Sequence, residues 1–125
     1  MSDKMITVSI LGVGSRGVAY GTIMNSMPNK FDIVALCDHN KEKTERHKEI
    51  FGVSGDMVFD DEKTFFEKKR SDLLIIATWD DSHVALAKRA IPLGYKILLE
   101  KPISDKRDEL TELREFAKKH NTFIM

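Results

Sequence analysis

The sequence has little cysteine and no long apolar run, and each shortage removes a class of protein. Its one cysteine, Cys37, cannot form an internal disulfide, which favours a reducing compartment such as the cytoplasm. No apolar run reaches the roughly 20 residues of a membrane-spanning helix. The first residues, Met1 to Lys4, lack the apolar core and cleavage site of a secretory signal. We therefore expect a cytoplasmic protein with no membrane partner.

An excess of charge of either sign is also missing. Twenty Lys and Arg residues balance twenty Asp and Glu residues, so no positive field is present to attract nucleic acid. We predict no nucleic-acid partner and no metal site. At 125 residues the chain has room for one domain with a real core, although it is small for an enzyme that binds two substrates.

Apolar runs of strand length alternate with helical segments along the whole chain. We expect strands at 5–11, 31–37, 57–59, 73–78, 96–100 and 122–125. We expect helices at 16–27, 41–51, 82–93 and 104–120, and a further one that begins after Asp60 or Asp61 and runs to about residue 69. Strands separated by helices predict right-handed crossovers and a parallel sheet. The fold class is therefore α/β, a doubly wound sheet of about six strands with helices on both faces.

Local signals mark several helix ends. Asn40 is a suitable N-cap for the helix at 41–51, and Gly52 is a suitable stop. Pro92 disfavours helix for the residue before it, so we expect the last turn before Gly94 to be distorted or cut short.

A glycine triplet follows the first predicted strand directly. Gly12, Gly14 and Gly17 form the pattern G-x-G-x-x-G, with Ser15 and Arg16 between the last two glycines. Glycines at this spacing allow a tight turn and bring backbone N–H groups close to a pyrophosphate at a helix N-terminus. Arg16 either reaches a phosphate or is simply solvated. The glycine triplet alone is weak evidence, and it predicts dinucleotide binding only together with an acidic residue at the end of the next strand.

Asp38 is such an acidic residue, because it directly follows the second predicted strand and lies 21 residues after Gly17. A carboxylate at this position accepts hydrogen bonds from the adenosine ribose and repels a 2′-phosphate, so we predict NAD in preference to NADP. Lys41 and Lys43 lie close enough to soften that repulsion. The alternative is that Asp38 only caps the helix that begins near Asn40.

A second group of polar residues follows the next two predicted strands. A T-x-x-x-x-H segment runs from Thr78 to His83, and the triplet Glu100-Lys101-Pro102 ends the strand after Gly94. Both lie at the carboxyl edge of a parallel sheet, where ligands bind. Together with the glycine loop and Asp38, these motifs resemble the glucose-fructose oxidoreductase, inositol dehydrogenase and MocA family over the whole chain. The resemblance implies a Rossmann-type NAD-binding domain.

The resemblance also implies roles for these residues. Thr78, Trp79 and His83 would line the dinucleotide, Glu100 would lie near the nicotinamide ribose, and Lys101 would contact the substrate and relay its proton. Lys101 can also be a solvated surface lysine, and His83 can make only a local hydrogen bond. Many members carry proline where this chain has Trp79, whose ring either stacks on cofactor or substrate or packs against another domain.

The function that the resemblance implies is hydride transfer between NAD and a secondary alcohol of a sugar, polyol or related compound. Family members carry a second, larger substrate domain that is absent from this chain, so we expect the chain to bind NAD without turnover and to expose an apolar surface that favours a homo-oligomer. The alternatives are the cofactor domain of an NAD-dependent glycosidase and a non-catalytic dinucleotide sensor. A class I methyltransferase would not explain Glu100-Lys101-Pro102.

Overall fold

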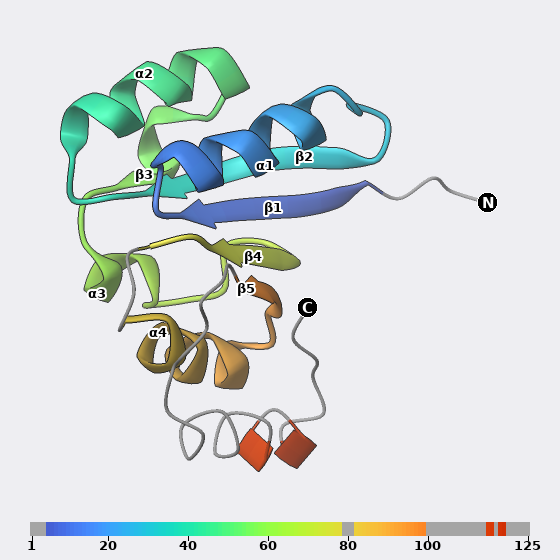
Figure 1. Cartoon of the computed structure of the whole chain (residues 1–125), viewed down its shortest axis with the longest axis vertical. Helices are drawn as coiled ribbons and strands as arrows, with labels where there is room; N and C mark the ends of the chain where they lie inside the picture. The colour runs from blue at the N-terminus through green and yellow to red at the C-terminus, as the bar shows by residue number, and fades with distance from the viewer. Residues whose placement is uncertain (1–4, 79–81, 100–114, 117, 120–125) are drawn as a thin grey trace.

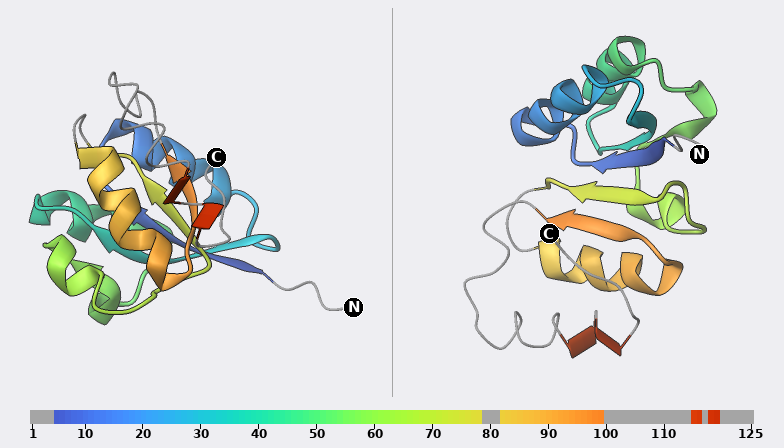
Figure 2. Two further views of the ribbon diagram at one scale, coloured as in Figure 1. Left: turned by 90° about the horizontal axis from the view of Figure 1, so that it is seen from below. Right: turned by 90° about the vertical axis from the view of Figure 1, so that its right-hand side faces the viewer.

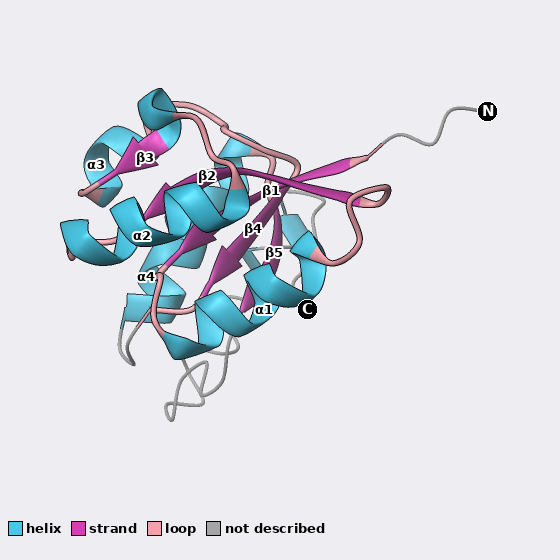
Figure 3. Ribbon diagram, turned by 90° about the horizontal axis from the view of Figure 1, so that it is seen from above, coloured by secondary structure: helices cyan, strands magenta, loops and turns pink. Residues whose placement is uncertain are grey.

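A computed structural model describes residues 5–78, 82–99, 115–116 and 118–119 and places five parallel strands in one sheet. The strands are β1 (Ile6–Leu11), β2 (Phe31–Cys37), β3 (Val58–Phe59), β4 (Leu73–Ile76) and β5 (Lys96–Leu99). Their order across the sheet is β3-β2-β1-β4-β5, and their arrows run in the same direction (Figure 3). This confirms the doubly wound α/β fold.

Helices cover both faces of this sheet. They are α1 (Ser15–Asn25), α2 (Lys41–Phe51), α3 (Glu62–Phe65) and α4 (Ser82–Ala90), with short 3₁₀ helices η1 (Gly55–Met57) and η2 (Ile91–Leu93). α1 and α2 lie on one face and α3 and α4 on the other, as Figure 1 and the right-hand view of Figure 2 show. Within the described ranges, every helix is too short or too polar to cross a bilayer.

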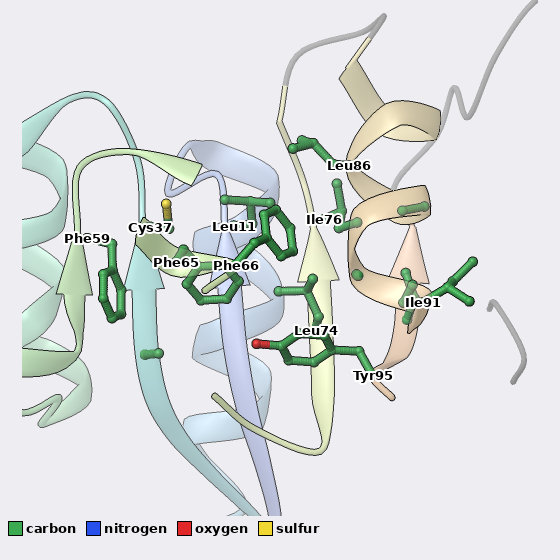
Figure 4. Close-up of a cluster of buried hydrophobic side chains, with 14 residues drawn as sticks. Leu11, Cys37, Phe59, Phe65, Phe66, Leu74, Ile76, Leu86, Ile91 and Tyr95 are labelled. Carbon is green, nitrogen blue, oxygen red and sulfur yellow. The ribbon is translucent and has the colours of Figure 1, made fainter. Parts of the chain in front are cut away.

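The core is divided by the sheet into two layers. On β4, Leu73 and Ile75 face α1 and α2, whereas Leu74 and Ile76 face α3 and α4. All four are buried, which explains why this strand carries no polar residue. The α3–α4 layer is rich in aromatic rings, and Figure 4 shows Phe65 and Tyr95 within it.

The register between β1 and β2 shifts by one residue. Val8 pairs with Ile33, but Ser9 pairs with Ala35, so Val34 is an extra residue in β2. Such a bulge resets the alternation of side chains along the strand. As a result, Ile33 and Leu36 both belong to the α1–α2 layer, although they are three residues apart.

Two predicted helix ends are confirmed. The Asn40 side chain accepts hydrogen bonds from the N–H groups of Glu42 and Lys43, and Gly52 ends α2 in the left-handed region with φ +68°. Pro92 stands in η2, so the predicted helix at 82–93 gives way to a 3₁₀ turn after Ala90.

Other predicted boundaries were wrong. The helix expected to run to residue 69 ends at Phe65, because Arg70 donates from Nε to the Phe65 carbonyl and from Nη2 to the Thr64 carbonyl. These bonds satisfy the last carbonyls of α3 with a side chain in place of another helical turn. Asp61 is its N-cap.

β4 ends at Ile76 rather than at residue 78, since its neighbour β1 turns away at Gly12 into the glycine loop. β3 begins at Val58, because Met57 belongs to η1. Residues 115, 116, 118 and 119 are helical, in agreement with the helix predicted at 104–120. The rest of that helix and the predicted strand at 122–125 lie outside the described residues.

Candidate functional site

The glycine loop that follows β1 depends on Gly12 for its direction. Gly12 has φ +100°, a conformation that residues with a side chain rarely adopt. A Cβ atom at this position would lie 2.7 Å from the carbonyl carbon of Ala77 and 2.8 Å from the backbone nitrogen of Thr78. Glycine here therefore lets the loop pass directly over the end of β4.

The other two glycines of the triplet have different surroundings. A Cβ atom on Gly17 would lie 2.0 Å from the Gly12 carbonyl oxygen, so this glycine lets α1 pack against its own loop. A Cβ atom on Gly14 would meet no heavy atom within 4 Å among the residues described. Gly14 lines a cavity, and its missing side chain leaves room for a ligand to approach the backbone.

The N-terminus of α1 starts at this loop. Gly14 is the N-cap, and the N–H of Val18 donates to the Gly14 carbonyl at 2.9 Å. The first turn, Ser15 to Gly17, contains no acidic side chain. The positive end of the helix dipole therefore lies at the cavity with no acidic side chain in the first turn itself, an arrangement that suits an anionic group.

Asp38 fixes the geometry between the loop and the end of β2. Its Oδ2 accepts a hydrogen bond from the N–H of Val13 at 2.7 Å, and its Oδ1 accepts one from the N–H of Asn40 at 2.8 Å. The cap of α2 is Asn40 itself, so capping is not the role of Asp38. A carboxylate has about four acceptor sites, which leaves both oxygens able to accept a further hydrogen bond.

These elements enclose a cavity of about 320 Å³ at the carboxyl edge of the sheet. It is lined by Leu11, Gly12, Gly14, Cys37, Asp38, His39, Lys43, Glu62, Ala77 and Thr78. The strand order arranges them along the edge, from Glu62 after β3, through Asp38 after β2 and the glycine loop after β1, to Thr78 after β4.

Several of these lining residues were not predicted from the sequence as site residues. His39 and Glu62 belong to different elements, and the Nε2 atom of His39 lies 3.1 Å from Oε2 and 3.3 Å from Oε1 of Glu62. Lys43 lies on α2, where the sequence had suggested only that it is close to Asp38. The signal that places Glu62 here is its position just after a strand that ends at the same edge.

Cys37 forms part of the cavity wall and is buried. Burial raises the pKa of its thiol well above the ordinary value, and the carboxylates of Glu62, Asp61, Asp38 and Asp60 raise it further, in that order. The thiol is therefore neutral in the folded protein and poorly nucleophilic. Cys37 is therefore a small buried residue at the end of β2.

The remaining predicted site residues fall into two groups: some lie in α1 or α4, and others lie outside the described residues. Arg16 is exposed in the first turn of α1, Ser15 begins that helix, and Gly17 is buried beneath the loop. His83 is the second residue of α4. Trp79, Glu100 and Lys101 lie outside the described residues, so their predicted roles remain predictions.

The sequence and the fold of this chain are similar to those of known dehydrogenases. A 104-residue segment is 29% identical to inositol 2-dehydrogenase 4 of Saccharopolyspora erythraea, covering 83% of this chain and 30% of that protein. The fold matches scyllo-inositol dehydrogenase of Lactobacillus casei, solved with NAD(H) and scyllo-inositol, with a TM-score of 0.88 and 20% identity over 98% of this chain and 36% of the other.

A putative NADPH-dependent oxidoreductase of Desulfitobacterium hafniense is also similar, with a TM-score of 0.84, 17% identity, and coverage of 100% of this chain and 35% of the other. The chain thus spans about a third of the length of these proteins. Residues 6–125 match the model of the Gfo/Idh/MocA family, described as an oxidoreductase family with an NAD-binding Rossmann fold. The sequence motifs, the fold and the family model all indicate the same family. The chain belongs to the Gfo/Idh/MocA oxidoreductase family and corresponds to its NAD-binding Rossmann fold.

Proposed function

We propose that this chain is the coenzyme-binding part of a dehydrogenase that uses NAD and acts on a secondary alcohol of a polyol or sugar. The observation that carries the preference for NAD is the Asp38 carboxylate, held by two backbone N–H groups on the cavity wall. Family membership supports a nicotinamide coenzyme, and the inositol dehydrogenases among the similar proteins support a polyol substrate.

The residues of the cavity suit such a coenzyme. The N-terminus of α1 and the open space at Gly14 suit a pyrophosphate, and Arg16 in the first turn adds a positive charge. Asp38, on the β2 side of the loop, suits the two hydroxyls of the adenosine ribose. The nicotinamide half would then extend in the opposite direction along the edge, towards Thr78 and the end of β4.

The resemblance to the family supports a reacting end formed by residues near β4 and β5. We propose that Thr78, Trp79 and His83 line the coenzyme there, that Glu100 lies by the nicotinamide ribose, and that Lys101 holds the substrate oxygen and relays its proton. When bound, NAD supplies a nicotinamide ring that exchanges hydride with the alcohol carbon.

The coenzyme preference is tested by titration calorimetry of the chain with NAD and with NADP. We expect tighter binding of NAD. The variant Asp38→Asn loses a charge-assisted hydrogen bond and should bind NAD about tenfold more weakly. Asp32→Asn is the matched control, because Asp32 is exposed in β2, the strand that Asp38 follows, and does not line the cavity, and it should bind NAD like the wild type. Tighter binding of NADP by the wild type would contradict the proposal.

We further propose that most substrate contacts come from a second domain that this chain does not contain. The chain spans only 30% of the inositol 2-dehydrogenase that it resembles. It should therefore bind NAD yet form no detectable NADH when myo-inositol or scyllo-inositol is added, as followed by NADH absorbance. Steady formation of NADH by the chain alone would refute this division of labour.

A further inference from the structure

The strand order places a second carboxylate beyond Asp38 on the same side of the glycine loop. β3 pairs with β2 through Leu36–Val58 and Cys37–Phe59, so the ends of these two strands lie side by side. Asp38 follows β2, and Glu62 follows β3 as the first residue of α3. Both side chains line the same cavity. If the adenosine ribose contacts Asp38, Glu62 lies on the side of that ribose away from the pyrophosphate.

The position of Glu62 is fixed by neighbouring groups. The Asp61 side chain caps α3 by accepting from the N–H of Thr64 at 2.7 Å, which fixes the backbone at this point. The Glu62 carboxylate lies 3.1 Å from Nε2 of His39, the residue directly after Asp38. Only 26% of the Glu62 side chain is exposed, so its charge is only partly screened by water.

The charge of Glu62 reaches the inner wall of the cavity. Among the carboxylates that raise the pKa of the Cys37 thiol, Glu62 has the largest effect, ahead of Asp38. Cys37 precedes Asp38 and lines the cavity with it. Among the described residues that line the cavity, Lys43, from the first turn of α2, carries the opposite charge.

From this arrangement we propose that Glu62 is a specificity-determining residue that acts with Asp38 against a 2′-phosphate on the coenzyme. The proposal rests on the proposed binding of a nicotinamide dinucleotide in this cavity. A 2′-phosphate carries nearly two negative charges, and with Asp38 alone Lys43 would balance much of the repulsion. With Glu62 present, the carboxylates outnumber the ammonium group. Glu62 thereby removes the tolerance for NADP that Lys43 would otherwise provide.

The test uses Glu62→Gln, which removes the charge while its amide oxygen still accepts a hydrogen bond from His39. The dissociation constants of NAD and NADP are measured by calorimetry for the 125-residue chain. We expect the NADP constant of the variant to fall about fivefold, because one repulsive charge at close range is lost, and the NAD constant to change little. Glu67→Gln is the matched control, since Glu67 is exposed and does not line the cavity.

A second variant, Glu62→Asp, retains the charge and should keep the wild-type preference, which separates the charge from any effect on folding. Raising the salt concentration should narrow the difference between wild type and Glu62→Gln. If Glu62→Gln binds NAD normally and its preference is unchanged, the role of Glu62 is refuted while NAD binding stands. If the wild type binds neither dinucleotide, the proposed function fails, and this inference fails with it.

Discussion

Individual glycines of the loop meet different physical requirements, although they belong to one motif. Gly12 is required by its positive φ and by the backbone of Ala77 and Thr78. Gly17 is required because the Gly12 carbonyl occupies the place of its side chain. Only Gly14 faces open space. The motif therefore combines two residues needed for the fold with one that lines the cavity and leaves it open.

We therefore expect two alanine variants to differ, one mainly in stability and the other mainly in NAD binding. Gly17→Ala should lower the free energy of unfolding by about 3 kcal/mol, because backbone must move to admit the methyl group. Gly14→Ala should lower it by less than about 1 kcal/mol, the cost of a poorer N-cap, yet weaken NAD binding about tenfold. Urea denaturation and calorimetry measure the two effects. Equal losses of stability in both variants would contradict this assignment.

At the scale of elements, α3 shows how a side chain far along the loop ends a helix. The Arg70 guanidinium donates to the carbonyls of Thr64 and Phe65 and lies 4.5 Å from the centre of the Phe59 ring. The backbone N–H of Arg70 donates to the hydroxyl of the buried Tyr95 at 2.7 Å. This residue therefore connects α3, β3 and the start of β5.

Arg70→Lys keeps the positive charge but loses the planar fork that reaches two carbonyls and covers a ring. We expect it to lower the free energy of unfolding by about 1–2 kcal/mol. The matched control is Arg46→Lys on the exposed side of α2, which should change stability by less than about 0.5 kcal/mol. If the two substitutions prove equally mild in urea denaturation, the contacts of Arg70 add nothing to stability.

Sequence patterns predicted the elements whose ends are set locally. The ends of α2 follow from Asn40 and Gly52, and the break in α4 follows from Pro92, because caps and proline act on adjacent backbone. The early end of α3 escaped prediction, since it depends on Arg70, which reaches back from beyond the helix.

The residues of the candidate site likewise include some that the sequence predicted and some that it did not. Asp38 and the glycines were predicted from their spacing along one βαβ unit. Glu62 and His39 were missed, although each follows a predicted strand, because their contact arises only when β3 pairs with β2. The gathering of strand ends at the carboxyl edge, Thr78 included, was predictable from the α/β pattern, whereas the contact of one particular side chain with another across the sheet was not.

For the whole molecule, two buried groups make stability depend on alkaline pH. Burial raises the pKa of the Cys37 thiol and that of the Tyr95 hydroxyl above their ordinary values. In the unfolded chain these groups ionise at their ordinary pKa, near 8.5 and 10. Their contribution to stability is therefore complete below about pH 8.5 and is lost progressively as the pH rises above that value.

We predict that the free energy of unfolding falls between about pH 9 and 10 by as much as about 1.4 kcal/mol per pH unit. Urea denaturation at a series of pH values measures this slope. Cys37→Ala removes the thiol and should flatten the slope over this range, whatever its effect on stability at neutral pH. A slope that is the same in the variant would show that other groups are responsible.

The central place of β1 in the sheet has a consequence for how the protein opens over time. β1 is bonded on both sides, to β2 and β4, and Val8 and Ile10 are fully buried, whereas β3 has only two residues. Its amide hydrogens should therefore be among the last to exchange with solvent, and those of β3 among the first. Because the glycine loop extends directly from β1, transient loosening of β3 would release Glu62 from the cavity while the glycine loop stays in place.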